Sequence, residues 1–245
     1  MIRMTRIWGA IREVGLKPVD GASLAAFRIM FGLMMTAGVV RFVANGWIER
    51  FFVTPEFMFK YWGFGWVEPL GPAAMVAVFA LMGVSALMVA IGFYYRFAIV
   101  LFLSLFSYVE LLDVSNYLNH YYLVSLLALI LVFLPANQTW SVDARLFPKV
   151  RQTTVQAWML WWLRFQMGCV YFFAGVAKFS EDWLIHAQPL HIWLRSRVEL
   201  PIIGALLQHW EVALMMSWAG FLFDTTIVFW LLWGRSRPWA YAVLV

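Results

Sequence analysis

The sequence predicts an all-α fold, a polytopic bundle of about six transmembrane helices with further interfacial helices. Of its 245 residues, 64% are hydrophobic and only 13% are charged, whereas soluble domains average about 45–50% apolar and about 25% charged residues. Aromatic residues make up 19% of the chain, which is typical of a protein with much surface at lipid interfaces. The net charge of +5 is therefore expected to lie in loops, and it does not indicate a nucleic-acid partner.

Six apolar runs account for the predicted spans. They lie at about residues 24–43, 73–93, 97–112, 119–134, 155–178 and 211–233. The connection between the second and third spans is so short that these helices must be antiparallel neighbours. We expect the runs to form one transmembrane domain over residues 1–245.

The remaining segments are predicted to lie at the membrane surface. Residues 1–20 combine basic and apolar residues, as in an interfacial segment on the cytoplasmic leaflet. Residues 45–72 are rich in glycine, proline and aromatic residues and form either a surface loop or a re-entrant lid over a site. We expect interfacial helices at residues 183–208 and the start of an incomplete further span at residues 239–245.

Loop charge predicts a cytoplasmic N-terminus. In that orientation the cytoplasmic loops hold ten basic residues and the outer loops hold four. The protein is then expected to be integral to a bacterial inner membrane, with Asn119, His120 and Lys178 all at outer helix ends. Residues that are far apart in the sequence are thus predicted to share one side.

Lys178, at the end of the fifth span, is either an anchor or a reagent. A lysine at a helix end can extend its amine to the interface. Apolar surroundings also disfavour the charged ammonium, which would leave a free amine to act as a base. Asn119 and His120 would then orient a polar head group, with Glu110 or Asp113 nearby.

Among the other charged residues of the predicted spans, the candidates for intramembrane pairing are Arg28, Glu110, Arg164 and Asp224. Charged residues at membrane depth usually face the bundle interior and pair with one another. Arg28 either extends to the interface or pairs with a carboxylate such as Glu110 or Asp224. Arg164 and Asp224 would suit a charge-paired pathway in a transporter or scaffold without chemistry, which is the alternative function.

Several kinds of site are not expected. The single cysteine excludes an internal disulfide, and the histidine spacing is a poor match to a metal site. The chain has no glycine-rich phosphate loop, no serine elbow and no zinc-protease signature. We therefore expect no metal.

Three motifs resemble one family. The stretch Tyr171-Phe-Phe-Ala-Gly-Val-Ala-Lys178-Phe-Ser-Glu-Asp-Trp183 resembles a helix end of the vitamin K-dependent γ-carboxylases and of the wider horizontally transferred transmembrane (HTTM) domain proteins. Asn119-His120-Tyr121-Tyr-Leu, followed by residues 136–143, is similar to a second signature of that family. Residues 219–224 are similar to a third, and Ala177 departs from the paired lysines of the carboxylases.

The resemblance implies a quinol-dependent activity. Lys178 would be the base that deprotonates reduced vitamin K or menaquinol, and His120 would contribute to the same site. Asn119, Tyr121 and Trp183 would contact the quinol. The reaction would consume oxygen and form an epoxide. Its lyase step would use carbon dioxide to carboxylate a protein glutamate, and the lipid bilayer would be the surrounding partner.

Overall fold

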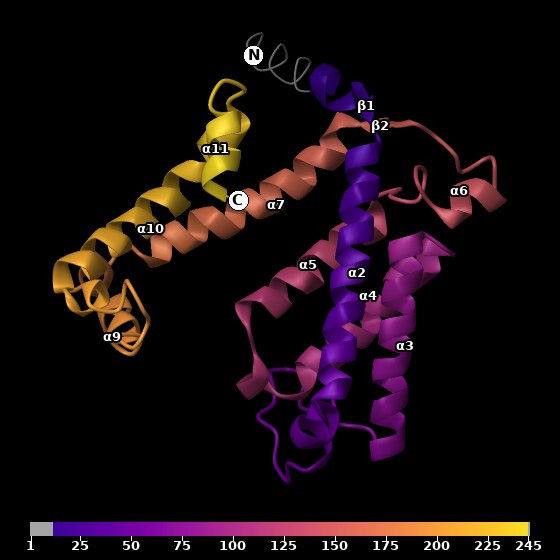
Figure 1. Ribbon diagram of the computed structural model, residues 1–245. Coiled ribbons are helices and arrows are strands. Elements are labelled where there is room, and N and C mark those ends of the chain that lie inside the picture. Colours follow the sequence, from indigo (N-terminus) through magenta and orange to yellow (C-terminus); the bar gives the residue numbers. More distant parts are fainter. Residues whose placement is uncertain (1–11, 245) are drawn as a thin grey trace. The chain divides into compact units, whose positions relative to one another are not determined.

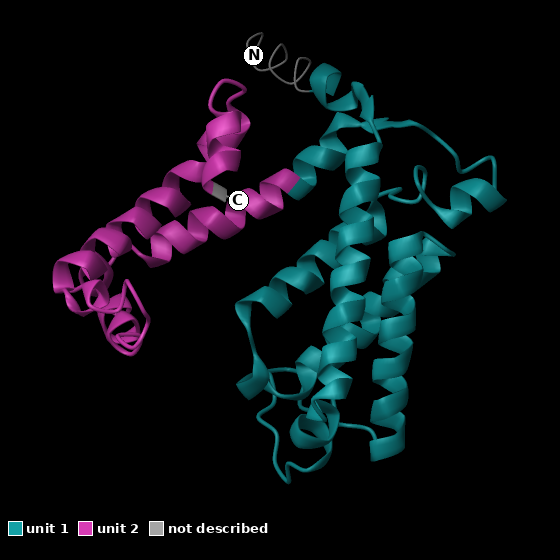
Figure 2. Ribbon diagram, viewed as in Figure 1, with its two compact units in different colours: residues 1–163 teal, residues 164–245 magenta. Residues whose placement is uncertain are grey.

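The computed structural model describes residues 12–244. It is predominantly helical, as the sequence predicts, and divides into two compact units, residues 1–163 and 164–245 (Figure 2). The first eleven residues of the predicted interfacial segment 1–20 lie outside the described residues, and residues 12–16 of that segment are helical.

Unit 1 contains four long helices that pack in sequence order. These are α2 (Ala22–Ala44), α3 (Pro72–Ile91), α4 (Tyr95–Leu112) and α5 (Asn119–Phe133), with α2 on α3, α3 on α4 and α4 on α5 (Figure 1). Shorter elements of this unit are η1 (Glu49–Val53), η2 (Val114–Asn116) and α6 (Val142–Leu146). Gly92 ends α3 in the left-handed conformation at φ 67°, and the short connection makes α3 and α4 neighbours.

A direct backbone contact joins α2 to α3. A Cβ atom on Gly32 would lie 2.5 Å from the backbone nitrogen of Ala90, so only glycine allows this approach. Around it packs a core of buried aromatic and aliphatic side chains, which includes Phe31, Phe79 and Phe102. The Phe31 and Phe102 rings meet edge to face at 5.7 Å.

One pair of short strands was not predicted. Strand β1 (Pro18–Asp20) pairs antiparallel with β2 (Thr154–Gln156), and Val19 lies opposite Val155. The prediction that a helix starts near residue 155 is therefore wrong by two residues, because Val155 is buried in the strand pair. Helix α7 (Ala157–Ala177) begins where the Ala157 amide donates to the Lys17 carbonyl, 3.0 Å away.

The short helices of unit 2 pack on its longest helix, α10 (Trp210–Leu232). Helix α7 continues into this unit and is followed by α8 (Glu181–Leu184), α9 (Leu190–Arg195), η3 (Leu206–Gln208), α10 (Trp210–Leu232) and α11 (Arg237–Leu244). Helix α10 contacts α8, α9, η3 and α11. The predicted interfacial stretch 183–208 thus contains short helical pieces that pack on α10.

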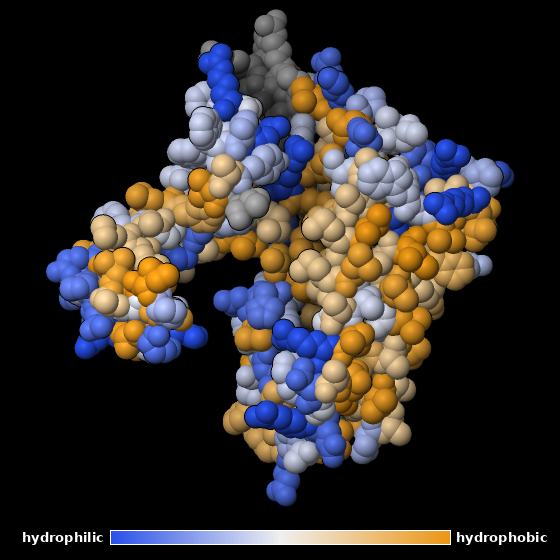
Figure 3. All heavy atoms as spheres, viewed as in Figure 1, coloured by the Kyte–Doolittle hydropathy of each residue, from blue (hydrophilic) through white to orange (hydrophobic). Residues whose placement is uncertain are grey.

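The helices confirm an integral membrane protein. Among the described residues, α2, α3, α4 and α10 are long and apolar enough to span a bilayer, and α5 is a shorter apolar helix of 15 residues. Helix α7 has 21 residues, but Arg164 and Gln166 interrupt its apolar sequence. In Figure 3 hydrophobic residues cover the helical middle of unit 1, and hydrophilic residues gather at its ends.

Candidate functional site

Unit 1 encloses a cavity of about 680 Å³. Its walls include parts of α2, η1, α3, α4 and α5, and half of its lining residues are methionine, phenylalanine, tryptophan or tyrosine. The apolar lining residues include Met34, Met35, Phe42, Trp47, Phe51, Phe52, Phe79, Met82, Phe102, Phe106 and Tyr121. Sequence analysis missed most of this lining, because a core aromatic and a cavity aromatic have the same helical spacing.

Apart from Arg41 of α2, the charged and strongly polar lining residues come from one stretch of chain. Glu110 lies in the last turn of α4, Asp113 follows that helix, Asn116 is in η2 and His120 is in the first turn of α5. Since α4 ends where α5 begins, these side chains share one end of unit 1. The structure therefore brings His120 together with Glu110 and Asp113 at one cavity.

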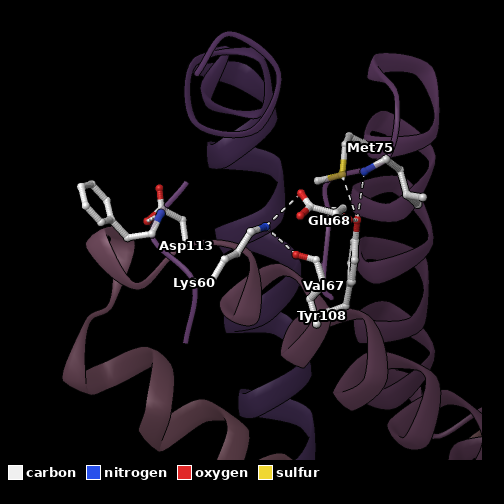
Figure 4. A network of polar contacts seen from close by, with 8 residues as sticks. Lys60, Val67, Glu68, Met75, Tyr108 and Asp113 are labelled. Carbon is white, nitrogen blue, oxygen red and sulfur yellow. Dashed lines mark hydrogen bonds and ion pairs between the residues drawn. The ribbon is translucent and has the colours of Figure 1, made fainter. Parts of the chain in front are cut away.

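A hydrogen-bonded loop, residues 54–71, lies at the same end (Figure 4). The Asp113 carboxylate accepts from the Phe59 amide at 3.3 Å. Lys60 forms an ion pair with Glu68 at 3.2 Å, and the Tyr108 hydroxyl on α4 donates to the Glu68 carbonyl at 2.9 Å. Among the described residues, the cavity lining includes Trp47, Phe51 and Phe52, which precede this loop, but no residue of the loop itself. The loop is therefore fixed to the end of α4 without closing the cavity.

Arg28 makes neither of the contacts that its sequence suggested. Its side chain is 0% exposed, and its guanidinium donates to the carbonyls of Val89 and Ala90 at 3.0 Å each and of Trp140 at 2.7 Å. Val89 and Ala90 lie in the last turn of α3, where helix carbonyls lack intrahelical partners. Arg28 thus caps the C-terminal end of α3, where a cation also complements the helix dipole.

Unit 2 contains the predicted lysine in an ion pair. The Lys178 ammonium donates to the Asp224 carboxylate of α10, and the two side chains are 22% and 13% exposed. The same ammonium lies 5.2 Å from the ring centroid of Trp183, and the Trp183 indole donates to the Ser217 carbonyl at 2.8 Å. Lys178 is therefore held by a carboxylate and an aromatic face, both from residues that the sequence singled out.

Gly175 allows the helix approach that this pair requires. A Cβ atom at Gly175 would lie 2.6 Å from the methyl carbon of Thr225, the residue that follows Asp224 in the chain. On the same helix, a Cβ at Gly168 would meet Val228 at an ordinary 3.5 Å. We expect Gly175→Ala to lower the thermal unfolding temperature, because overpacking costs about 1–3 kcal/mol.

Gly168→Ala is the matched control for this prediction. It should leave stability unchanged or raise it, because alanine is about 0.5–1 kcal/mol better than glycine within a helix. Thr225→Ser deletes the obstructing methyl group. Added to Gly175→Ala, it should raise the thermal unfolding temperature back toward that of wild type. Thermal unfolding in detergent measures all three, and equal melting of both glycine variants would contradict the close approach.

The other predicted site residues are more isolated. Asn119 begins α5 but does not line the cavity, whereas Tyr121 does. Arg164, on α7, makes no ion pair within the part of the chain that is described. His120 belongs to unit 1 and Lys178 to unit 2, and their joint site stays a prediction. Among residues 12–244, no group of three or more His, Cys, Asp or Glu could hold a metal ion.

A comparison with protein families finds one match over nearly the whole chain. The model described as the HTTM domain matches residues 16–245. This range contains the cavity of unit 1 and the ion pair of unit 2. No solved structure matches.

Proposed function

The chain belongs to the HTTM domain family, and from this premise we propose that it binds a quinol and uses Lys178 as the base for quinol oxidation. The membership relates this integral membrane protein to the carboxylase family. Reduced vitamin K or menaquinol is the proposed ligand. The proposed outcome is an epoxide, coupled to carboxylation of a protein glutamate with oxygen and carbon dioxide as co-reactants.

The cavity of unit 1 is the observation that carries quinol binding. Its volume of about 680 Å³ lies within the roughly 300–1,000 Å³ of small-molecule sites, which are mostly apolar with a few placed polar groups. A quinol needs this combination, because its ring and isoprenoid tail are apolar and its hydroxyls are polar. His120 and Asn116 at the polar end can exchange hydrogen bonds with the hydroxyls.

The ion pair of unit 2 supports the role of Lys178 in proton transfer. In the proposed step the Lys178 ammonium first passes its proton to solvent, and the neutral amine then accepts a proton from a quinol hydroxyl group. The Asp224 carboxylate stabilises the ammonium that results. The quinol supplies the oxygen-dependent chemistry. Trp183 holds the side chain in position through the cation–π contact.

Substitution of His120 tests the proposed ligand site. We expect purified protein in nanodiscs to bind menaquinol and form its epoxide under oxygen, and His120→Gln to weaken binding by about tenfold, the worth of one lost hydrogen bond. The matched control is His186→Gln, since His186 does not line the cavity. Calorimetric titration measures binding and chromatography measures the epoxide. Failure of wild-type protein to bind menaquinol would overturn the proposal.

A second candidate is a scaffold or transporter without chemistry. The observation that favours it is the Lys178–Asp224 ion pair itself, because charge pairs at membrane depth also serve structure and ion pathways. In that case the protein should function equally well when the lysine and the aspartate of the pair are exchanged. The exchange of the two residues, treated in the Discussion, separates this candidate from the enzyme.

A further inference from the structure

Glu110 is a carboxylate near the end of a helix long enough to span a bilayer, and the described structure leaves it without a partner. It lies in the last turn of α4 and lines the cavity, and its side chain is half-buried. Within residues 12–244 it makes no hydrogen bond, and the ion pairs there are Lys60–Glu68 and Lys178–Asp224. An unpaired carboxylate in apolar surroundings is costly, so this position calls for an explanation.

The other polar groups at this end of the cavity already have roles. Asp113 is buried and accepts from the amides of Phe59 and Ser115, at 3.3 and 2.9 Å. The Arg41 guanidinium lies over the Trp47 ring, 5.2 Å from its centroid. Glu110 is thus the carboxylate of the lining whose oxygens are uncommitted in the described part of the chain.

The helix geometry explains why Glu110 faces the cavity. Tyr108, two residues earlier, points to another side of α4. There its hydroxyl accepts a hydrogen bond from the Leu70 amide at 3.1 Å and lies 3.7 Å from the Met75 sulfur (Figure 4). Two residues correspond to about 200° around a helix. Because Tyr108 is fixed against Leu70 and Met75, Glu110 projects from a different side of α4, where it lines the cavity.

We propose that Glu110 is the specificity-determining residue of the cavity, the acceptor for a hydroxyl of the bound head group. In its ionised form, which mildly alkaline solution favours, the Glu110 carboxylate only accepts hydrogen bonds. It therefore favours a ligand with O–H donors and disfavours an otherwise identical ring that carries only carbonyl or ether oxygens. This inference rests on the proposed quinol binding and deepens it, since it assigns the choice among ring forms to one side chain.

Three ligands with the same ring and one isoprenoid unit test the assignment. These are the 2-methyl-1,4-naphthohydroquinone, its dione and its dimethyl ether, titrated without oxygen into protein in nanodiscs. We expect wild-type protein to prefer the hydroquinone over the other two by about 10- to 100-fold, because hydrogen bonds to charged groups are the stronger ones. Glu110→Gln, which keeps the shape and adds a donor, should remove most of that preference.

Glu68→Gln is the matched control, because Glu68 pairs with Lys60 and does not line the cavity. It should keep the wild-type preference. Equal binding of all three ligands to wild-type protein would overturn the role of Glu110 while leaving quinol binding intact. A preference that survives in Glu110→Gln would also overturn it. No binding of any of the three would instead overturn the proposed function, together with this inference. The wild-type comparison keeps the test decisive even if Glu110→Gln folds poorly.

Discussion

Lys178→Ala is expected to reduce epoxide formation by about 10²- to 10⁴-fold, the usual contribution of a general base. The variant removes the amine and leaves the Asp224 carboxylate without the partner seen in unit 2. Quinol binding should fall far less than epoxide formation, because the residues that line the cavity of unit 1 remain unchanged. Single-turnover epoxide formation under oxygen, alongside calorimetric binding, measures the two effects separately.

A charge exchange separates the chemistry of this pair from its structural role. Lys178→Asp combined with Asp224→Lys keeps one ammonium and one carboxylate across the same two helices but moves the amine to α10. We expect the double variant to melt closer to wild type than either single variant, since breaking a partly buried pair strands a charge. Epoxide formation should remain lost. Wild-type function in the double variant would contradict the base and support the scaffold or transporter.

Arg28→Met is expected to destabilise the protein by about 3–5 kcal/mol, as when one side of a buried charged network is removed. Methionine fills a similar apolar volume but removes the donor to the carbonyls of Ala90 and Trp140 and leaves the Val89 carbonyl with the Gly92 amide alone. Each buried carbonyl that loses its partner costs about 1–3 kcal/mol. The expected observation is a large fall in the thermal unfolding temperature in detergent.

Arg41→Met provides the control for Arg28. Both arginines lie on α2, but Arg41 is exposed and its recorded contact is with the Trp47 ring, and exposed pairs of this kind contribute about 1 kcal/mol or less. Its melting temperature should stay near that of wild type. A small effect of Arg28→Met would show that water or another group satisfies the end of α3.

The sequence was most informative where one physical signal dominated. Apolar length alone places α2 to α5 and α10 within a few residues of the predicted spans, because a bilayer fixes how long a spanning helix must be. Motif and chain position likewise brought out His120, which lines the cavity, and Lys178.

Partners could not be predicted in the same way. Arg28 was expected either at the interface or beside a carboxylate, but it binds main-chain carbonyls, which every residue carries and no sequence pattern marks. Asp224 was expected to pair with Arg28 or Arg164, but its partner is Lys178, because the close approach of Gly175 and Thr225 brings the end of α7 to α10. The strand pair rests on two short segments that are too brief to give a periodic signal.

That strand pair also constrains the order in which the parts of unit 1 form during synthesis. Strand β1 directly precedes α2, and its partner β2 directly precedes α7. Since a chain is synthesised from its N-terminus, β1 has no partner until α2, α3, α4 and α5 have all left the ribosome. The pairing of Val19 with Val155 therefore closes unit 1 as a late step, after its four long helices are already available to enter the bilayer.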